Sequence, residues 1–330
     1  MAFIKLKNVS YRYPYSKEPA LKDVSISFER GKFYGIVGEN GGGKTTLCNL
    51  IRGLIPHFYN GTLEGDVLVD GKDIREWDTA ELSIQIGYIF QNPFSQISGV
   101  KPTVFEEIAM GLENLGVPKD EMIERVINVC EKLKIEELIE KNPNELSGGQ
   151  RQRVAFASIM VMDMPTLVID EPTSQLDPEG TEGVFSIISE LKKSNKTILL
   201  IEHKMDLIAE YCDEVVVIQN GQIALHGPTK EVLVNPRLNE YGAVMPEVTR
   251  FGHEMSKAAS LWQVFRSRSK MPNGLSGKRR RNRWQLKSKT QALHIRTAIA
   301  RWSISTLPST RASALPSWDR TVRVKPPASR

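Results

Sequence analysis

The stretch GENGGGKTTLCNL, residues 38–50, carries four glycines and a lysine directly ahead of an apolar segment. It fits the pattern G-x-x-x-x-G-K-[ST] of a phosphate-binding loop. The run FYGIVG that leads into it, residues 33–38, is typical of a buried strand. The following segment spaces its apolar side chains as a helix does, at Leu47, Leu50, Ile51 and Leu54. We therefore predict a phosphate loop between a strand and a helix. The alternative is a flexible glycine turn before an ordinary helix.

The chemistry of such a loop follows from its residue types. Glycines let backbone N–H groups surround phosphate oxygens, and the N-terminus of the following helix adds a partial positive charge. We expect Lys44 to reach the β- and γ-phosphates of a nucleotide and the Thr45 hydroxyl to ligate Mg²⁺.

A second motif, TLVIDEP at residues 166–172, is an apolar run that ends in two carboxylates. In a parallel sheet Asp170 would lie beside the phosphate loop and bind Mg²⁺, directly or through a water. Glu171 would lie on the more exposed side and orient or deprotonate an attacking water. The alternative is an acidic cap on a buried strand, and the presence of the phosphate loop favours the catalytic interpretation.

A third motif is NELSGGQRQRVAFA at residues 144–157, where Ser147, Gly148 and Gly149 again precede a helix-like run. It predicts a second helix N-terminus that can take phosphate. The alternative is a serine N-cap with a glycine turn. One nucleotide rarely needs two phosphate cradles, whereas two subunits arranged head to tail would need both.

Other segments indicate the fold class. Apolar runs at residues 166–170, 197–201 and 214–218 predict buried strands, and residues 182–194 between them predict a helix. This order indicates an α/β fold with a parallel, helix-covered sheet. Residues 61–74 predict an antiparallel hairpin that turns at Asp70-Gly71. We expect residues 117–142, rich in Glu, Lys, Ile and Leu, to be wholly helical.

Charge divides the chain into two parts. Residues 251–330 contain 18 Lys+Arg and two acids, a net charge of +16, which leaves residues 1–250 near −11. From about residue 260 the sequence shifts to Arg, Ser, Trp and Pro without periodicity, which predicts disorder. This basic tail has three interpretations: a lipid-binding segment, a nucleic-acid-binding segment, or the product of a shifted reading frame or a fusion.

The remaining composition indicates a soluble intracellular protein. The sequence has no run of 18 apolar residues, so we expect no membrane span, and its first residues lack the apolar core of a signal peptide. Its three cysteines, Cys48, Cys130 and Cys212, lie far apart and are interpreted as bystander thiols in a reducing compartment.

The sequence LSGGQ at residues 146–150, between a phosphate loop and an acidic strand, resembles the ATP-binding subunit of an ATP-binding cassette (ABC) transporter. The resemblance covers about residues 2–250. It implies a P-loop cassette with a mixed parallel core sheet, an antiparallel β subdomain and a helical subdomain at about residues 92–160. We expect the cassette to occupy residues 1–250 and the basic tail residues 251–330.

The resemblance also implies site residues. Gln91 in FQNP matches the glutamine that senses Mg²⁺ and the membrane partner, and His203 in IEHK matches the switch histidine at the γ-phosphate. Tyr13 in YRYP matches the aromatic residue that stacks on adenine, with Tyr11 as the other candidate. For each, the alternative is a structural residue.

The implied catalytic residues are Glu171, His203, Lys44 and Gln91. The implied ATP-binding residues are Tyr13, Gly38, Asn40, Gly41, Gly43, Lys44, Thr45, Thr46, Ser147, Gly148, Gly149, Gln150 and, in the D-loop, Asp177. The implied Mg²⁺ ligands are Thr45, Gln91 and Asp170.

A finer resemblance lies in residues 53–74, 90–97 and 103–117, which look like the ATPase subunits of energy-coupling factor importers of vitamins, cobalt and nickel. It implies a second ATP-binding subunit, identical or paralogous, a transmembrane scaffold that docks on residues 91–111, and a separate membrane protein that binds the substrate. It also implies a peripheral position on the cytoplasmic face of the membrane.

Two rival functions remain from the sequence. One is a soluble ABC-type ATPase that acts on nucleic acid or ribosomes, which the basic tail alone favours. The other is a non-enzymatic regulator with a cassette fold, which the presence of Glu171 and His203 argues against.

Overall fold

The computed structural model of the 330-residue chain describes residues 2–256, except 93–94, 175, 177 and 248. The chain divides into one unit of Met1–Ala258 and another of Ala259–Arg330. The second unit lies outside the described residues, and so does the tail segment predicted to be disordered. Residues 251–256, at the start of the basic tail, are helical together with residues 249–250.

The phosphate loop follows β3 (Phe33–Val37), an interior strand of a six-stranded sheet with the order β10-β9-β3-β8-β7-β6. Its strands are β3 (Phe33–Val37), β6 (Ile86–Ile89), β7 (Thr166–Asp170), β8 (Thr197–Ile201), β9 (Glu214–Gln219) and β10 (Gln222–Pro228). The pairs β3–β8, β3–β9, β6–β7 and β7–β8 are parallel, and β9–β10 is antiparallel. The mixed parallel core sheet and the strands predicted at residues 166–170, 197–201 and 214–218 are therefore confirmed.

Alternate residues of the core sheet enter two hydrophobic cores. On β3, Phe33 and Val37 pack into one core, whereas Tyr34 and Ile36 pack into the other. The first core includes side chains of helices α4 (Val104–Asn114), α5 (Lys119–Leu133), α6 (Gly148–Met160), α7 (Pro178–Lys193) and α8 (Met205–Tyr211). The second includes side chains of α1 (Lys44–Ile51) and the antiparallel sheet. Burial on both faces explains why β3 and β8 read as continuous apolar runs.

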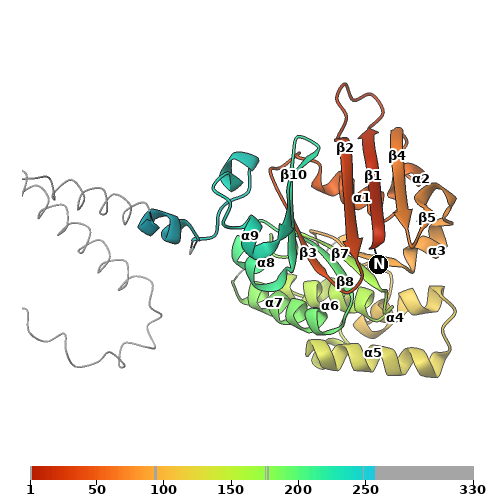
Figure 1. Ribbon diagram of the computed structural model, residues 1–330. Coiled ribbons are helices and arrows are strands. Elements are labelled where there is room, and N and C mark those ends of the chain that lie inside the picture. Colours follow the sequence, from red (N-terminus) through yellow and green to blue (C-terminus); the bar gives the residue numbers. More distant parts are fainter. Residues whose placement is uncertain (1, 93–94, 175, 177, 248, 257–330) are drawn as a thin grey trace, which may run out of the picture. The chain divides into compact units, whose positions relative to one another are not determined.

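The antiparallel sheet has the order β2-β1-β4-β5 (Figure 1). Its strands are β1 (Ala2–Arg12), β2 (Leu21–Glu29), β4 (Thr62–Val69) and β5 (Lys72–Asp73). The predicted hairpin is present between β4 and β5, and both turn residues, Asp70 and Gly71, have positive φ, at 49° and 82°. Both central residues of a type I′ turn require positive φ, which explains the strength of the Asp-Gly signal.

The helices α4 (Val104–Asn114), α5 (Lys119–Leu133) and α6 (Gly148–Met160) occupy the range predicted for the helical subdomain. Figure 1 shows α4 and α5 at the end of the molecule away from the antiparallel sheet. The other helices are α2 (Leu54–His57), α3 (Thr79–Ser83), α7 (Pro178–Lys193), α8 (Met205–Tyr211) and α9 (Thr229–Val232). Short 3₁₀ turns lie at Ile74–Glu76, Glu136–Leu138, Pro143–Glu145 and Leu238–Tyr241.

The prediction that residues 117–142 are wholly helical is wrong. The helix α5 ends at Leu133, because Lys134 adopts a left-handed conformation with φ of 53°. The N–H of Ile135 then bonds to the carbonyl of Cys130 at 3.1 Å, as in a helix-terminating turn. The turn buries Ile135 and Leu138 completely, so tertiary burial outweighs the helical propensity of the segment.

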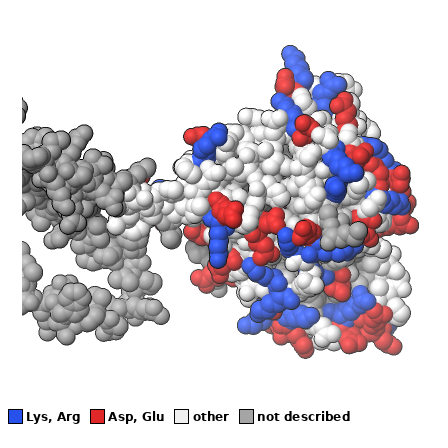
Figure 2. All heavy atoms as spheres, viewed as in Figure 1, with Lys and Arg blue, Asp and Glu red and all other residues white. Residues whose placement is uncertain are grey.

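The surface of the described unit carries both signs of charge. On the face shown in Figure 2, basic and acidic side chains alternate over the surface. Among the described residues, no helix is both long and apolar enough to cross a membrane.

Candidate nucleotide-binding site

The phosphate loop joins β3 to α1 with the predicted geometry. Gly38 has a φ of 143°, and a Cβ added there would lie 2.0 Å from the carbonyl oxygen of Ile218. The N-cap of α1 is Gly43, with a left-handed φ of 113°, so it supplies no side chain to cap the first N–H groups of the helix. These uncapped backbone donors, at the positive end of a helix, fit a phosphate group.

Lys44 is held inside this loop. Its side chain is 6% exposed, and Nζ donates to the carbonyl oxygens of Gly38 at 2.8 Å and Glu39 at 3.0 Å. Burial lowers the pKa of Lys44, while the nearby carboxylates of Glu171 and Asp170 oppose this shift. A bound phosphate would give the buried ammonium a stronger, charged partner than two carbonyls.

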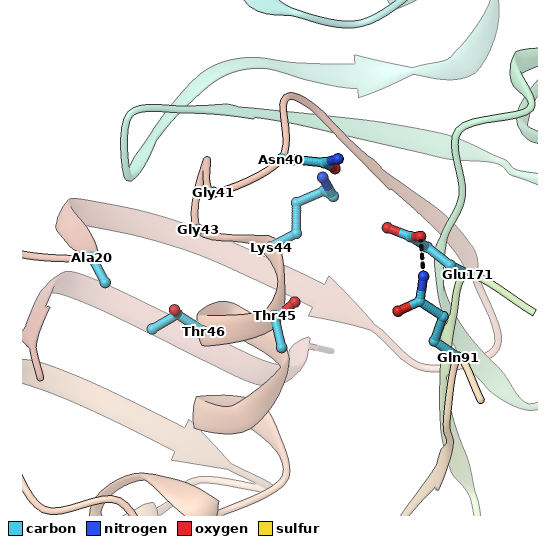
Figure 3. A pocket seen from close by; sticks show the side chains of 9 residues that line it. All are labelled: Ala20, Asn40, Gly41, Gly43, Lys44, Thr45, Thr46, Gln91 and Glu171. Carbon is cyan, nitrogen blue, oxygen red and sulfur yellow. Dashed lines mark hydrogen bonds between the residues drawn. The ribbon is translucent and has the colours of Figure 1, made fainter. Parts of the chain in front are cut away.

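A cavity of about 330 Å³ opens over the loop (Figure 3). Its lining contains six of the predicted ATP-binding residues and two predicted catalytic residues that are distant from them in sequence. The lining residues are Ala20, Asn40, Gly41, Gly43, Lys44, Thr45, Thr46, Gln91 and Glu171. The sequence offered no signal for Ala20, which enters the site because its carbonyl approaches Gly43.

Glu171 lies at the centre of the predicted catalytic group. Its Oε2 accepts a hydrogen bond from Nε2 of Gln91 at 2.8 Å, and its Oε1 lies 2.9 Å from Nε2 of His203. The three residues follow β7, β6 and β8, whose carboxyl ends meet at one edge of the parallel sheet. Glu171 also has a positive φ of 43°, which is uncommon for a residue with a side chain and is found at functional sites.

Asp170 is partly buried and has a different partner from Glu171. The hydroxyl of Tyr88 donates to its Oδ2 at 2.5 Å. Burial raises the pKa of Asp170, while the hydrogen bond from Tyr88 opposes the rise. The guanidinium of Arg52, at the end of α1, lies 3.8 Å from the centroid of the Tyr88 ring. Sequence reasoning missed Tyr88, which lies three residues before Gln91, on the strand that leads to it.

The predicted Mg²⁺ ligands are all oxygen donors, which are the ligands that Mg²⁺ prefers. The side chains of Thr45 and Gln91 line the cavity, and Asp170 ends β7 beside Glu171. Within the described part of the chain, no cluster of three or more His, Cys, Asp or Glu side chains could hold a metal ion. The residues present therefore fit a Mg²⁺ ion that arrives with nucleotide phosphates and keeps water ligands.

The LSGGQ motif begins a different helix. Ser147 is the N-cap of α6; its Oγ accepts from the N–H of Gln150 at 3.4 Å, and Oε1 of Gln150 accepts from the N–H of Ser147 at 3.1 Å. This capping box is the structural alternative considered for the motif, and it is present. Ser147 and Gly148 are exposed, and no residue of the motif lines the cavity described above.

The structure separates the two candidate adenine-stacking residues. Tyr11 is 1% exposed and its hydroxyl lies within hydrogen-bonding distance of the Tyr59 and Asn60 carbonyls, so its ring is not available to a ligand. Tyr13 is half-buried, and its hydroxyl lies 3.3 Å from Oγ1 of Thr46 in the phosphate loop. Tyr13 therefore lies beside the nucleotide cavity. Asp177, the predicted D-loop residue, lies outside the described residues.

Comparison with known proteins agrees with this geometry. A family model described as "ABC transporter" matches residues 21–174. An ABC transporter ATP-binding protein of Pyrococcus abyssi is 44% identical over 259 residues, which cover 78% of this chain and 92% of that protein. The energy-coupling factor transporter ATP-binding protein EcfA2 of Acetivibrio thermocellus is 38% identical over 256 residues, which cover 74% and 87% of the two chains.

Two solved structures are also similar. cbiO1 of Clostridium perfringens, part of the ABC transporter complex cbiONQ, is 32% identical with a TM-score of 0.64, covering 77% of this chain and 99% of that one. A dimeric ATP-binding cassette in a post-hydrolysis state, bound to ADP and Pi, is 27% identical with a TM-score of 0.59, covering 68% and 98%. The phosphate loop, the paired carboxylates and the LSGGQ helix thus occur in one fold that these proteins share. The chain belongs to the ATP-binding proteins of ABC transporters, a family of ATPases.

Proposed function

We propose that this chain is the ATP-hydrolysing subunit of an energy-coupling factor importer and acts in a head-to-tail pair of ATP-binding subunits. The observation that carries the proposal is the convergence of Gln91 and His203 on Glu171, beside the Lys44 cavity. The similarity to EcfA2 and to cbiO1 supports the importer type.

The position of each site residue suits a distinct role in ATP binding or hydrolysis. The backbone of residues 38–45 and the Lys44 ammonium bind the phosphates. Thr45 and Asp170 would hold Mg²⁺, which would supply positive charge against the charge that develops on the phosphates. Glu171 orients the attacking water and accepts its proton. His203 and Gln91 hold Glu171 and face the γ-phosphate side of the cavity, and Tyr13 stacks on the adenine ring.

A second subunit completes the site. The exposed Ser147 and the N-terminus of α6 lie apart from this chain's own cavity, so their phosphate-binding capacity is directed to another molecule. In a head-to-tail pair the LSGGQ helix of each subunit closes over the ATP bound by the other. The similarity to a dimeric cassette bound to ADP and Pi supports the pairing of two cassettes.

The remaining partners follow from the importer type. A transmembrane scaffold docks on residues 91–111, where Val100 is 82% exposed although it is apolar. A separate membrane protein selects the substrate, a vitamin or a transition-metal ion. The chain then works as a peripheral protein on the cytoplasmic face of the membrane.

Purification of the full chain from its native membranes in mild detergent tests this function. We expect it to bring down a multi-pass scaffold and a small membrane protein, and the latter identifies the substrate. Retention of ribosomes or nucleic acid through nuclease treatment, lost when residues 260–330 are deleted, would instead support the soluble ATPase that the basic tail favours.

A further inference from the structure

A second carboxylate, that of Glu202, lies directly before His203 in the chain. Glu202 follows the end of β8 and is 3% exposed. A buried carboxylate is stable only when hydrogen-bond donors surround it. Oε2 of Glu202 accepts from the Thr173 hydroxyl at 2.9 Å. Oε1 accepts from the backbone N–H of His203 at 2.9 Å and of Lys204 at 3.2 Å.

These bonds join the two loops that carry the catalytic group. Thr173 belongs to the loop after β7, two residues beyond Glu171, and it is itself buried at 2% exposure. His203 and Lys204 belong to the loop after β8. The loops are also joined by the bond from the Glu171 N–H to the Ile201 carbonyl at 2.9 Å. Glu202 therefore fixes the backbone of His203 to the segment that holds Glu171.

The simpler explanation is that Glu202 only caps α8, since it accepts N–H groups just before that helix begins. That explanation accounts for Oε1. It does not account for Oε2, which is directed to a side chain of a different loop and is buried with it. A residue that only caps α8 needs no hydrogen-bond partner in the loop after β7.

We propose that Glu202 is a positioning residue for ATP hydrolysis, which aligns His203 with Glu171 through its bond to Thr173. This inference rests on the proposed function. The switch histidine is 47% exposed on its side chain, whereas the carboxylate that anchors its backbone is buried. The alignment is thus set below the surface, where solvent does not compete for the hydrogen bonds.

The test compares the full-length variants Glu202→Ala, Glu202→Gln, Thr173→Val and Thr173→Ser by ATP turnover, ATP binding and thermal midpoint. We expect Glu202→Ala to lower kcat about 10- to 100-fold, because a displacement near 1 Å can have that effect, with ATP binding close to wild type. Glu202→Gln keeps the shape and one acceptor oxygen, so it retains most of kcat. Thr173→Val lowers kcat, and Thr173→Ser, which keeps the hydroxyl, restores it.

The double variant Glu202→Ala/Thr173→Val separates positioning from general loss of stability. If Glu202 and Thr173 act through the same hydrogen bond, the kcat of the double variant is no lower than that of Glu202→Ala alone. Asp78→Ala is the control, because Asp78 caps α3 by accepting from the N–H of Ala80 at 2.8 Å, away from the site. It lowers the thermal midpoint and leaves kcat unchanged.

Wild-type kcat in Glu202→Ala, or additive losses in the double variant, would overturn the inference. A fall of kcat strictly parallel to the thermal midpoint across all variants, including Glu202→Gln, would do the same. If Glu202→Ala does not fold, the comparison of Thr173→Val with Thr173→Ser still shows whether kcat depends on the hydroxyl that bonds to Glu202. Absence of ATP turnover in the wild-type chain, assayed with its membrane partners, would contradict the proposed function itself and is a separate outcome.

Discussion

Tyr88 donates a hydrogen bond from its hydroxyl to Oδ2 of Asp170, across the parallel pair of β6 and β7. Three residues further on, Gln91 donates to Glu171. Tyr88 on β6 and Gln91 just after it therefore bond to two neighbouring carboxylates, Asp170 at the end of β7 and Glu171 just after it. This arrangement makes the strand before Gln91 part of the site and leads to the first prediction.

Replacing Tyr88 by Phe removes the donor and keeps the ring that packs against Arg52. Asp170 then loses a bond that holds its orientation and favours its charged form. We expect the Mg²⁺ concentration needed for half-maximal ATP turnover to rise several-fold. We also expect a loss of stability of about 1.5–3 kcal/mol, the range for a hydrogen bond to a charged group. A titration of ATP turnover with Mg²⁺ measures the first effect. An unchanged Mg²⁺ concentration at half-maximal turnover would contradict the role given to Tyr88.

The burial of Asp170 gives a pH-dependent prediction for the protein without nucleotide or Mg²⁺. Its pKa in the folded protein is raised by burial above the ordinary value of 3.8. The folded state thus binds a proton more readily than the unfolded state, so this residue favours folding at low pH, and that stability is lost as pH rises through the folded pKa. At pH 7 the ionised carboxylate opposes folding.

We therefore expect Asp170→Asn to raise the thermal midpoint at pH 7 while it weakens Mg²⁺-dependent turnover. The gain in midpoint shrinks as the pH falls, because a growing fraction of folded wild-type protein then has Asp170 protonated as well. Thermal melts of both proteins between pH 7 and pH 4 measure this. A gain that stays constant over the range would show that burial of the charge is not its cause.

The phosphate loop contains a matched pair of glycines. A Cβ at Gly38 would lie 2.0 Å from the backbone of Ile218, whereas at Gly41, which also has positive φ, no described heavy atom lies within 4 Å. We expect Gly41→Ala to lower the free energy of unfolding by about 1–2 kcal/mol through its backbone conformation alone. Gly38→Ala should lower it by more, because the sheet itself must shift. Denaturant unfolding measures both, and equal losses would contradict the steric explanation.

Sequence patterns predicted the structural features that depend on residues adjacent in the chain. The strands β7, β8 and β9 are short apolar runs with both faces buried, and the Asp70-Gly71 turn needs only two residues of positive φ. The phosphate loop is likewise a local feature. These elements could be located because a few adjacent residues determine them.

The features that were missed depend on contacts between distant segments. The pairing of β1 with both β2 and β4 contains register shifts that no local pattern encodes. The end of α5 at Leu133 follows from burial of Ile135 in the first core, not from helix propensity. The bonds of Tyr88 to Asp170 and of Thr173 to Glu202 join residues 82 and 29 positions apart, so they emerge only when the sheet is assembled.

The most direct test of the central claim is ATP-dependent dimerisation of the Glu171→Gln variant, measured by size exclusion with and without Mg²⁺. Glutamine keeps the shape of the side chain but cannot accept the proton of the attacking water. We expect ATP turnover to fall by about 10²- to 10⁴-fold, the range for loss of a general base, while ATP binding persists. We expect a stable ATP-bound dimer that is absent with ADP and in the Lys44→Ala variant. A variant that turns over ATP at the wild-type rate, or that stays monomeric with bound ATP, would contradict it.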